Sequence, residues 1–349
     1  MGRKIEIYNE PFSKLRRDGL DISGTATPGR YRFMDCDTFL SKRHLRIVEC
    51  EGIRLSSDSF RYSVISYVWR GNSVSSDPAS PCYWQDKHGV FSVKGAEDGD
   101  PISLDVLWHA CTASELSYAC PFGCRWLWLD RICILQTSKM DKAWQISQMY
   151  EIYSHSDACI ILPGGVRRLV SLDEETSWIH RAWTLQEALT PCQPWVLYTW
   201  KHARCVLRLK TGDSHGTSSV AIQSVIEGQS AMSHLKELLA LNAHPGGAST
   251  FKVAGVELKG HVRLFGTPKV ADMLRRSLED SFRESSIWFS SLMRTSSRPV
   301  DMIFSIMHFF GVSLDPRIFG ENDRTKAAIA LTQGRTSQLV MDHLSLTLR

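Results

Sequence analysis

The chain has 349 residues, of which 43% are hydrophobic, 41 are Lys or Arg and 37 are Asp or Glu. A chain of this length and apolar content can bury a sizeable core in one large or two medium domains. Its net charge of only +4, carried by dispersed basic residues, excludes the basic footprint of a nucleic-acid-binding protein.

Two further features define the expected setting of the protein. The longest apolar stretch, Val300 to Leu314, is interrupted by Asp301 and is shorter than the roughly 20 apolar residues of a membrane span. The ten cysteines include no Cys-x-x-Cys pair, and Cys120 and Cys124 lack the further ligands of a zinc site. We therefore expect free thiols, a reducing cytoplasmic location, no membrane span and no metal.

The N-terminal third combines an extension with one strongly predicted strand. Residues 1–57 form the expected extension, in which residues 31–45 predict a strand followed by a helix. Residues 60–69 predict a strand buried on both faces, because the run is short and rich in β-branched and aromatic residues. Residues 72–99 are rich in Ser, Pro, Gly and Asp and predict a long surface loop, with a short hairpin at 82–93.

Helical patterns follow. Apolar residues at helical spacing predict a helix over residues 102–120. The capping-box pattern Ser138-Lys-Met-Asp141 begins a second helix, whose expected apolar face comprises Met140, Trp144, Met149 and Tyr153. Residues 177–189 predict a third helix, which ends before Pro191.

Buried strands are expected between these helices, at 63–68, 126–129, 159–162 and 195–198. Strands that alternate with helices favour an α/β fold, in which these strands are neighbours in an open, mostly parallel, flavodoxin-like sheet with helices on both faces. We expect this main domain to occupy residues 58–210.

The composition changes beyond Lys210, where cysteine is absent and Ser, Gly and charged residues become more frequent. Helical patterns at 220–241 and 270–293 surround an expected hairpin at 251–265. The sequence therefore predicts a mainly helical C-terminal region, residues 211–349, that packs on the sheet as a cap.

Three ordered blocks carry a family resemblance: Tyr62-Ser-Val-Ile-Ser-Tyr-Val-Trp69, Trp126-Leu-Trp-Leu-Asp-Arg-Ile-Cys-Ile-Leu-Gln136 and Trp178-Ile-His-Arg-Ala-Trp-Thr-Leu-Gln-Glu-Ala-Leu189. Over positions near 60 to 200 the chain resembles the heterokaryon-incompatibility (HET) domain of filamentous fungi. Arg298-Pro-Val-Asp301 and the apolar run after it resemble a Pro-Arg-Asp segment and helix found downstream of that domain. The resemblance implies a role in non-self recognition and cell death.

HET domains in turn resemble TIR domains, and the order of elements here permits that comparison. Val64-Ile-Ser-Tyr67 is similar to the first TIR strand, and Trp128-Leu-Asp130 to a strand that ends in an acidic residue. Trp183-Thr-Leu-Gln-Glu187 has the Trp-to-Glu spacing of the catalytic segment in TIR domains that cleave NAD. The resemblance implies that Glu187 is catalytic and that NAD is a substrate, with no resident cofactor.

The helix expected over 177–189 has a polar face independently of this resemblance. At about 100° per residue, one stripe contains Trp178, Ala182, Leu185 and Leu189, and the opposite side contains His180, Trp183 and Glu187. A tryptophan and a carboxylate that face away from an aliphatic stripe suit a cleft. They equally suit a helix packed between two layers, with Glu187 in a structural ion pair.

Other candidate site residues lie near the ends of the predicted strands. Asp130 follows a strand at the edge where open α/β sheets bind ligands, so it could orient a substrate, or instead cap a helix or form an ion pair with Arg131. Arg131 and Arg181 could hold a pyrophosphate or form ordinary salt bridges. Tyr67 and Trp69 either line a pocket with Trp183 or pack in the core.

The alternatives differ in class. One is an enzyme that acts on a small-molecule nucleotide, or another small-molecule enzyme of secondary metabolism built on the HET fold. The other is a non-catalytic death-signalling module that self-associates as a homo-oligomer. A nucleophilic Cys133 assisted by His180 is a further chemistry, but the apolar run around Cys133 favours an inert core thiol.

Overall fold

The computed structural model describes residues 2–57, 60–80, 82–116, 123–202, 204–210, 217–242, 249–253, 256–260, 262–278 and 283–347. Within these residues a 10-stranded sheet has the order β1-β3-β2-β7-β4-β8-β9-β12-β11-β10. Its centre consists of β7 (Trp126–Trp128), β4 (Tyr62–Tyr67), β8 (Ala158–Leu162) and β9 (Pro194–Thr199), and each adjacent pair is parallel. The expected neighbours are confirmed.

The sheet as a whole is mixed, so the expectation of a mostly parallel sheet holds only at its centre. One antiparallel flank is formed by β1 (Arg3–Pro11), β3 (His44–Glu51) and β2 (Tyr31–Asp35), which pairs with β7. The other is formed by β12 (Ser230–His234), β11 (Thr217–Ile226) and β10 (Cys205–Lys210). A tight turn at Gly228 (φ 68) joins β11 to β12, and a connection this short can join only antiparallel strands.

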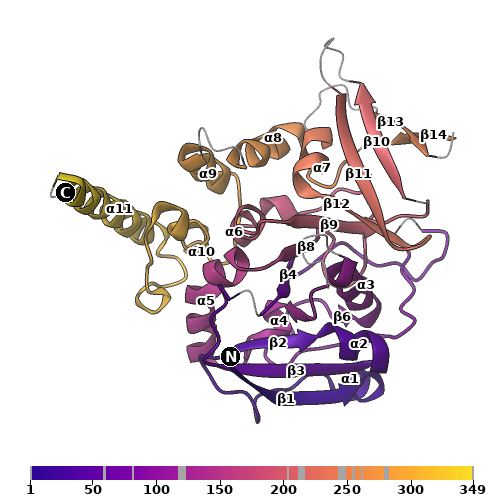
Figure 1. Ribbon diagram of the computed structural model, residues 1–349, viewed down its shortest axis with the longest axis horizontal. Coiled ribbons are helices and arrows are strands. Elements are labelled where there is room, and N and C mark those ends of the chain that lie inside the picture. The colour runs from indigo at the N-terminus through magenta and orange to yellow at the C-terminus, as the bar shows by residue number, and fades with distance from the viewer. Residues whose placement is uncertain are drawn as a thin grey trace.

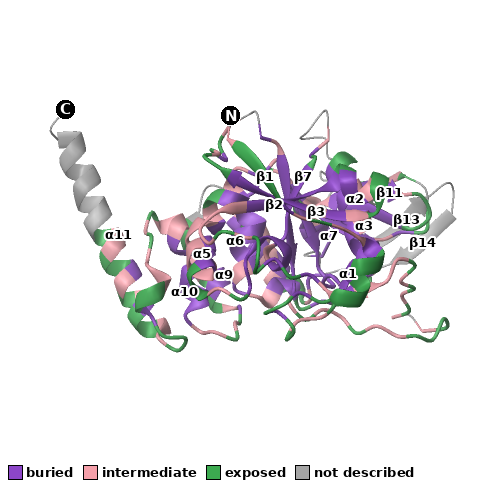
Figure 2. Ribbon diagram, turned by 90° about the horizontal axis from the view of Figure 1, so that it is seen from below, coloured by how far each residue is buried: buried purple, intermediate pink, exposed green. Residues whose placement is uncertain are grey.

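Helices lie on both faces of the sheet, as the sequence predicts. α2 (Cys36–Lys42) and α3 (Leu104–Leu116) lie on one side, and α5 (Lys139–Ser154) and α6 (Trp183–Leu189) on the other (Figures 1 and 2). The central strands β4 and β8 are buried along their whole length. Among the described helices, none combines the length and apolar character that crossing a bilayer requires.

The strand and helix expected over 31–45 are present as β2 and α2, but the loop after β4 differs from its prediction. No hairpin forms between 82 and 93 in the described residues. β5 (Val90–Phe91) instead pairs with β6 (Ile102–Ser103), just before α3. The sequence pattern missed this pairing because each strand has only two residues.

The N-terminal strands are tied to the sheet and to α5 by buried charges. Arg32 on β2 is 0% exposed, and its Nη1 lies 2.9 Å from Asp141 Oδ2, while its Nε lies 3.4 Å from Glu49 on β3. Asp141 also accepts the backbone N–H groups of Gly29 and Leu135, each at 2.8 Å. This network explains why the buried face of α5 includes Asp141.

The cap predicted at the start of α5 is present, since Ser138 Oγ accepts a hydrogen bond from Asp141 N at 3.2 Å. The expected apolar face is partly wrong, because Met140 is 68% exposed whereas Met149 and Tyr153 are buried. The helix turns Asp141 inward to meet Arg32, which rotates Met140 into solvent.

The helix expected over 177–189 is broken. A 3-10 turn, η1 (Trp178–His180), is followed by the short helix α6. Between them, Thr295 donates its backbone N–H to His180 O at 2.6 Å and accepts the N–H of Ala182 at 3.0 Å. This pairing with a distant segment interrupts the helical ladder.

The C-terminal region is not only helical. The helix expected over 220–241 is wrong, since β11 and β12 occupy its first half and only α7 (Leu235–Asn242) is helical. Val220 and Ile222 are buried while Ala221 is exposed, which is the alternation of a strand with one buried face. The expected hairpin is present as β13 (Ser249–Val253) and β14 (Val256–Gly260).

The remaining C-terminal helices lie beside α6 and beyond it (Figure 1). The pattern at 270–293 corresponds to α8 (Pro268–Ser277) and α9 (Arg283–Leu292). α10 (Asp301–Phe304) and η3 (Met307–Phe310) follow, and η4 (Pro316–Ile318) precedes α11 (Arg324–Thr347), which projects from the body of the molecule.

Candidate functional site

A cavity of about 470 Å³ opens at the carboxyl ends of β4 and β7. α5, α6 and the segment that leads into α10 supply its other walls. The lining includes nearly all of the site residues expected from the sequence: Tyr67, Trp69, Asp130, Arg181, Trp183 and Glu187. Asp130 and Glu187, which come from different elements, therefore share one cavity.

Arg131 is the exception, because it lies behind the lining. It is 1% exposed, donates to the carbonyls of Asp100 and Ala96, and places its guanidinium 4.9 Å from the ring centroid of Trp69. These contacts hold the loop at 96–100 against Trp69. In this position Arg131 supports the cavity wall rather than facing a ligand.

Glu187 is held by a hydrogen-bonded chain that starts at Trp178. Trp178 Nε1 donates to Ser66 Oγ at 2.8 Å, and Ser66 Oγ donates to Glu187 Oε2 at 2.6 Å. An indole N–H can only donate, so Ser66 Oγ accepts from Trp178 and keeps its own O–H for Glu187. The carboxyl is thereby fixed through Oε2. The break before α6 makes this possible, since an unbroken helix would place Trp178 and Glu187 on opposite sides.

The environment of Glu187 disfavours its charge. Glu187 is 7% exposed, and its burial raises its pKa from 4.5 to about 8. The hydrogen bond from Ser66 opposes this shift, the negative charge of Asp130 adds to it, and Arg181 and Arg294 oppose it. The cavity thus holds a carboxyl that is largely protonated at neutral pH and that a nearby cation would ionise.

Arg294 is a buried cation that interacts electrostatically with Glu187. It is 4% exposed, and its Nη1 donates to Arg181 O at 2.9 Å and to Thr184 Oγ1 at 2.7 Å. Burial lowers its pKa to about 9, against the attraction of Glu187. Arg294 therefore fixes the break between η1 and α6 and supplies positive charge near the carboxyl.

Asp130 is paired with a tyrosine. Tyr67 Oη donates to Asp130 Oδ1 at 2.7 Å. Burial raises the pKa of Tyr67 well above 10, so its hydroxyl stays protonated and remains a donor. Burial also raises the pKa of Asp130, whereas the bonds from Tyr67 and from the Arg131 N–H favour its ionised form. Asp130 is also the first residue of α4 (Asp130–Cys133). It therefore lies at a helix end and lines the cavity at the same time.

Glycines shape the entrance beside Trp69. A Cβ at Gly71 would lie 1.9 Å from Gly164 O, so the loops after β4 and β8 touch where only glycine fits. Gly71 N donates to Asp100 Oδ2 at 2.6 Å, which ties the same turn to the loop over Trp69. The turn at Arg70-Gly71 after Trp69 therefore depends on a close backbone contact.

Several lining residues were not expected from the sequence. Asp301 and Arg298 reach the cavity from the segment before and at the start of α10. The Arg298-Pro-Val-Asp301 motif was visible in the sequence, but nothing there indicated that it lies beside α6. Ser66 had a weaker signal, since a serine inside an otherwise apolar buried strand needs a hydrogen-bond partner.

Other chemistries find little support. Cys133 is 0% exposed, its Sγ points at Leu127 O, and burial raises its pKa to about 12, so it is an inert core thiol. In the described residues no three His, Cys, Asp or Glu side chains gather as metal ligands. Cys120, one half of the weak zinc pattern, lies outside the described residues.

Comparison with known proteins relates part of the chain to a family. Residues 62–168 match the family model of heterokaryon incompatibility protein (HET). This segment runs from β4 to just beyond β8 and contains Tyr67, Trp69 and Asp130, whereas Glu187 and Asp301 lie after it. No curated protein and no solved structure matches the chain significantly.

Proposed function

We propose that this protein, whose residues 62–168 match the HET family model, is a cytoplasmic effector of non-self recognition that hydrolyses NAD at the nicotinamide–ribose bond. The observation that carries the proposal is the cavity in which Glu187 meets Asp130, two tryptophans and Arg181. The Trp183-to-Glu187 spacing supports it through the resemblance to TIR domains that cleave NAD.

The order of the central strands also supports a nucleotide ligand. β7, β4, β8 and β9 are the second, first, third and fourth parallel strands along the chain, which resembles the flavodoxin-like order. In such sheets ligands bind outside the carboxyl ends, where the strand order reverses. Tyr67, at the end of β4, and Asp130, just after β7, lie beside that point and line the cavity.

The proposed reaction needs one well-placed carboxylate. The bond between the ribose carbon and the nicotinamide nitrogen breaks, and its electron pair leaves with neutral nicotinamide. The ribose becomes oxocarbenium-like, and water adds to it and loses a proton. In this scheme Glu187 stabilises the cationic ribose or accepts the water proton. Arg181 binds pyrophosphate, and Trp69 and Trp183 offer faces for stacking.

The rate of cleavage should depend on pH through Glu187. Its pKa of about 8 means that the ionised form increases as pH rises toward and beyond 8. We expect kcat/KM to rise through pH 8 and then level off, because this parameter reports the free enzyme. The positively charged nicotinamide ring of bound NAD favours the carboxylate and lowers its pKa. The rise in kcat should therefore occur at a lower pH than the rise in kcat/KM.

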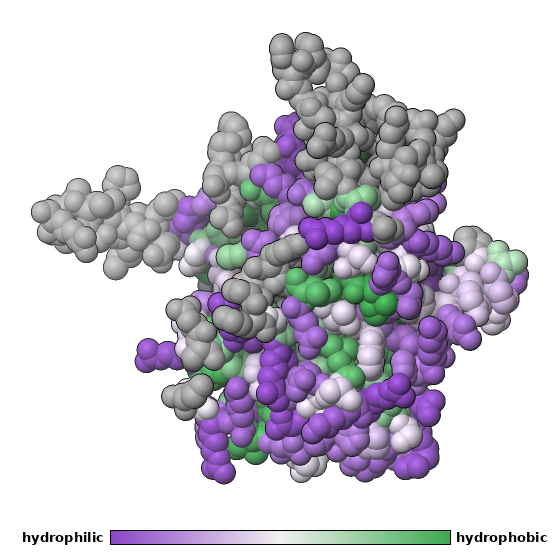
Figure 3. Space-filling model, turned by 45° about the vertical axis from the view of Figure 1, so that its right-hand side comes forward, coloured by the Kyte–Doolittle hydropathy of each residue, from purple (hydrophilic) through white to green (hydrophobic). Residues whose placement is uncertain are grey.

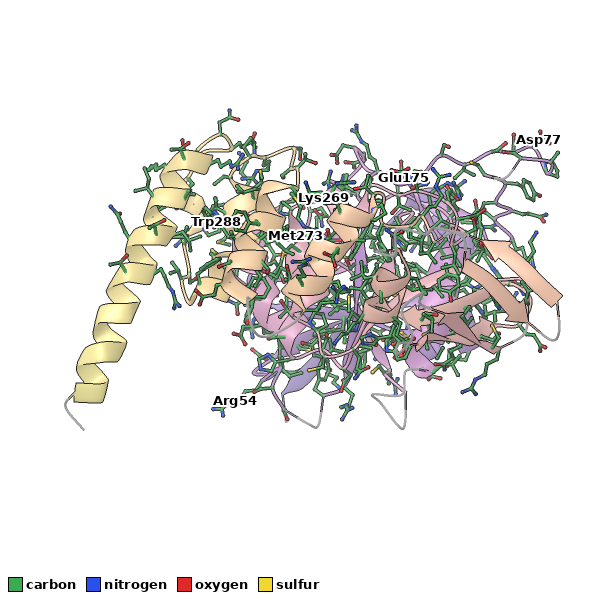
Figure 4. All side chains as sticks on the ribbon, turned by 90° about the horizontal axis from the view of Figure 1, so that it is seen from above. Arg54, Asp77, Glu175, Lys269, Met273 and Trp288 are labelled. Carbon is green, nitrogen blue, oxygen red and sulfur yellow. The ribbon has the colours of Figure 1, made fainter. Side chains whose placement is uncertain are left out.

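This profile is measured as nicotinamide release between pH 5.5 and 9 at subsaturating and saturating NAD. The control is Glu175→Gln, an exposed glutamate on the surface (Figure 4), whose profile should match that of the wild type. A wild-type kcat/KM that is flat across this range would remove Glu187 from the proposed role.

The second candidate is a self-associating signalling module. On the face shown in Figure 3, hydrophobic residues form several separate areas among hydrophilic ones. The large exposed apolar side chains include a C-terminal group: Phe289, Leu292, Ile318 and Ile329. These residues lie on α9, η4 and α11, and α11 projects from the body. Sedimentation of the whole protein over a concentration series tests homo-oligomer formation through this region.

A further inference from the structure

The two oxygens of the Glu187 carboxyl are in different environments. Oε2 accepts a hydrogen bond from Ser66 Oγ at 2.6 Å. Oε1 has no hydrogen-bond partner in the described part of the chain, and it is not among the polar atoms that are both buried and without a partner. Oε1 therefore retains accessible surface. Since Glu187 lines the cavity, a ligand in the cavity can reach this oxygen.

The Ser66 hydroxyl is constrained by its second partner. Within the described residues, its side chain bonds to the Trp178 indole N–H, at 2.8 Å, and to Glu187. The indole N–H can only donate, so the hydroxyl accepts from Trp178. If a protonated Oε2 donated to Ser66 as well, the Ser66 O–H would be left in the buried interior without an acceptor, which is unfavourable. The proton of the neutral carboxyl therefore lies on Oε1.

We propose that Ser66 is a positioning residue, which reserves Glu187 Oε1 for the substrate and for the proton that the reaction releases. This inference rests on the proposed function, in which water adds to the cationic ribose. The water oxygen forms a bond with the ribose carbon, one O–H bond of the water breaks, and its proton passes to Oε1 while Oε2 continues to accept from Ser66. Ser66 is 0% exposed and is not part of the cavity lining, so it acts through Glu187.

Ser66 is one of several groups that set the titration of Glu187. Its hydrogen bond favours the ionised form, against the burial that raises the pKa of Glu187 to about 8. The charges that act on the carboxyl from neighbouring segments are those of Asp130, Arg181 and Arg294. Burial also keeps three nearby groups neutral, with pKa values well above their usual ranges: Tyr67, Tyr153 and Cys159. All of these groups remain when Ser66 is substituted, so a change in the titration of Glu187 reports the lost hydrogen bond.

Ser66→Ala removes the hydroxyl without adding atoms to the buried strand. The ionised form of Glu187 loses a donor, so its titration should move upward by roughly one pH unit, the scale for one hydrogen bond to a charged group. At pH 7 kcat/KM should therefore fall about 10-fold, and the deficit should narrow as the pH rises beyond 9. Ser66→Thr keeps the hydroxyl and should retain the wild-type profile.

Infrared difference spectroscopy locates the proton without turnover. Each protein is measured from pH 6 to pH 9.5 against its own Glu187→Gln counterpart, which isolates the C=O band of protonated Glu187. In the wild type this carbonyl oxygen is Oε2, which accepts from Ser66, and a hydrogen bond to a carbonyl oxygen lowers its stretching frequency. Ser66→Ala should raise the frequency of the band and shift its disappearance to higher pH.

The matched control is Ser63→Ala, three residues earlier on β4. Ser63 is equally buried, but it accepts a hydrogen bond from Ser114 Oγ at 2.8 Å and makes none with Glu187. The control variant therefore loses a buried hydroxyl of the same strand. It should leave both the infrared band and the pH profile of kcat/KM unchanged.

A wild-type band at the frequency of a free carbonyl would overturn the inference, and this observation needs no variant of Ser66. The inference would also fail if the band and its pH midpoint were the same in folded Ser66→Ala as in the wild type, or if Ser63→Ala shifted them equally. The expected band shift combined with an inability of the wild type to cleave NAD would contradict the proposed function alone, and Oε1 would remain the oxygen that a ligand can reach.

Discussion

Glu187→Gln is expected to reduce NAD cleavage by roughly 10²-fold or more and, at alkaline pH, to stabilise the protein. The loss of rate follows from removing a preorganised negative charge that acts in the transition state. The gain in stability follows because glutamine resembles the protonated carboxyl, which is the form that the buried site prefers.

The sign of the stability effect follows from proton linkage. Since folding raises the pKa of Glu187 from 4.5 to about 8, the folded protein holds a proton that the unfolded chain has lost in this range. Wild-type stability should therefore fall as pH rises through this window, by at most about 1.4 kcal/mol per unit, and then level off. The negative charge of Asp130 accentuates the effect, and Arg181 and Arg294 reduce it. The variant lacks this dependence.

Thermal unfolding at pH 5.5 and pH 9, together with turnover on the same preparations, separates the two roles of Glu187. We expect Glu187→Gln to exceed the wild-type Tm clearly at pH 9 and by much less at pH 5.5. Glu175→Gln, with its exposed side chain, should differ from the wild type in neither measurement. A lower Tm at both pH values with normal cleavage per folded molecule would instead identify a structural ion pair.

Arg32→Met should cost about 3–5 kcal/mol of unfolding free energy, the scale for removing one partner from a buried ion pair. Arg32 and Asp141 are both 0% exposed, and the substitution leaves Asp141 and the nearly buried Glu49 without their cation. Because the network joins β2, β3 and α5, the substitution should lower the stability of the whole sheet and not that of the N-terminal strands alone.

Urea unfolding followed by far-UV circular dichroism measures this cost. The control is Arg30→Met, which removes a pair between the 36% exposed Arg30 and the 47% exposed Glu51 and should change stability by less than about 1 kcal/mol. If Arg32→Met changed stability as little as Arg30→Met, the network would not hold the N-terminal strands to α5.

The sequence predicted the centre of the fold because buried parallel strands carry a strong local signal. β4 and β8 read as short apolar runs, and the alternation with helices placed them together. The flanks of the sheet were harder to predict from the sequence. Over 220–241 the apolar residues also fit helical spacing, and the alternation typical of strands is too short there to stand out. The break before α6 depends on Thr295, which lies more than a hundred positions away in the chain.

The candidate site was predictable where a residue ends a strand or belongs to a recognised block. Tyr67, Asp130, Trp183 and Glu187 were proposed in this way, and all four line one cavity. Arg131 lies behind Trp69, because a sequence pattern does not determine the direction of a side chain. Ser66, Arg294 and Asp301 act through tertiary contacts, and no local spacing connects them with Glu187.

Direct measurement of products from NAD tests the central claim. The purified wild-type protein is incubated with NAD at pH 8, at concentrations from dilute to those that promote self-association, and nicotinamide and ADP-ribose are quantified by chromatography. The account predicts equimolar release of both products by the wild type and at least roughly 10²-fold less by Glu187→Gln. An absence of nicotinamide at every concentration, from protein that is folded, would contradict the hydrolase and leave the self-associating module as the remaining proposal for this protein.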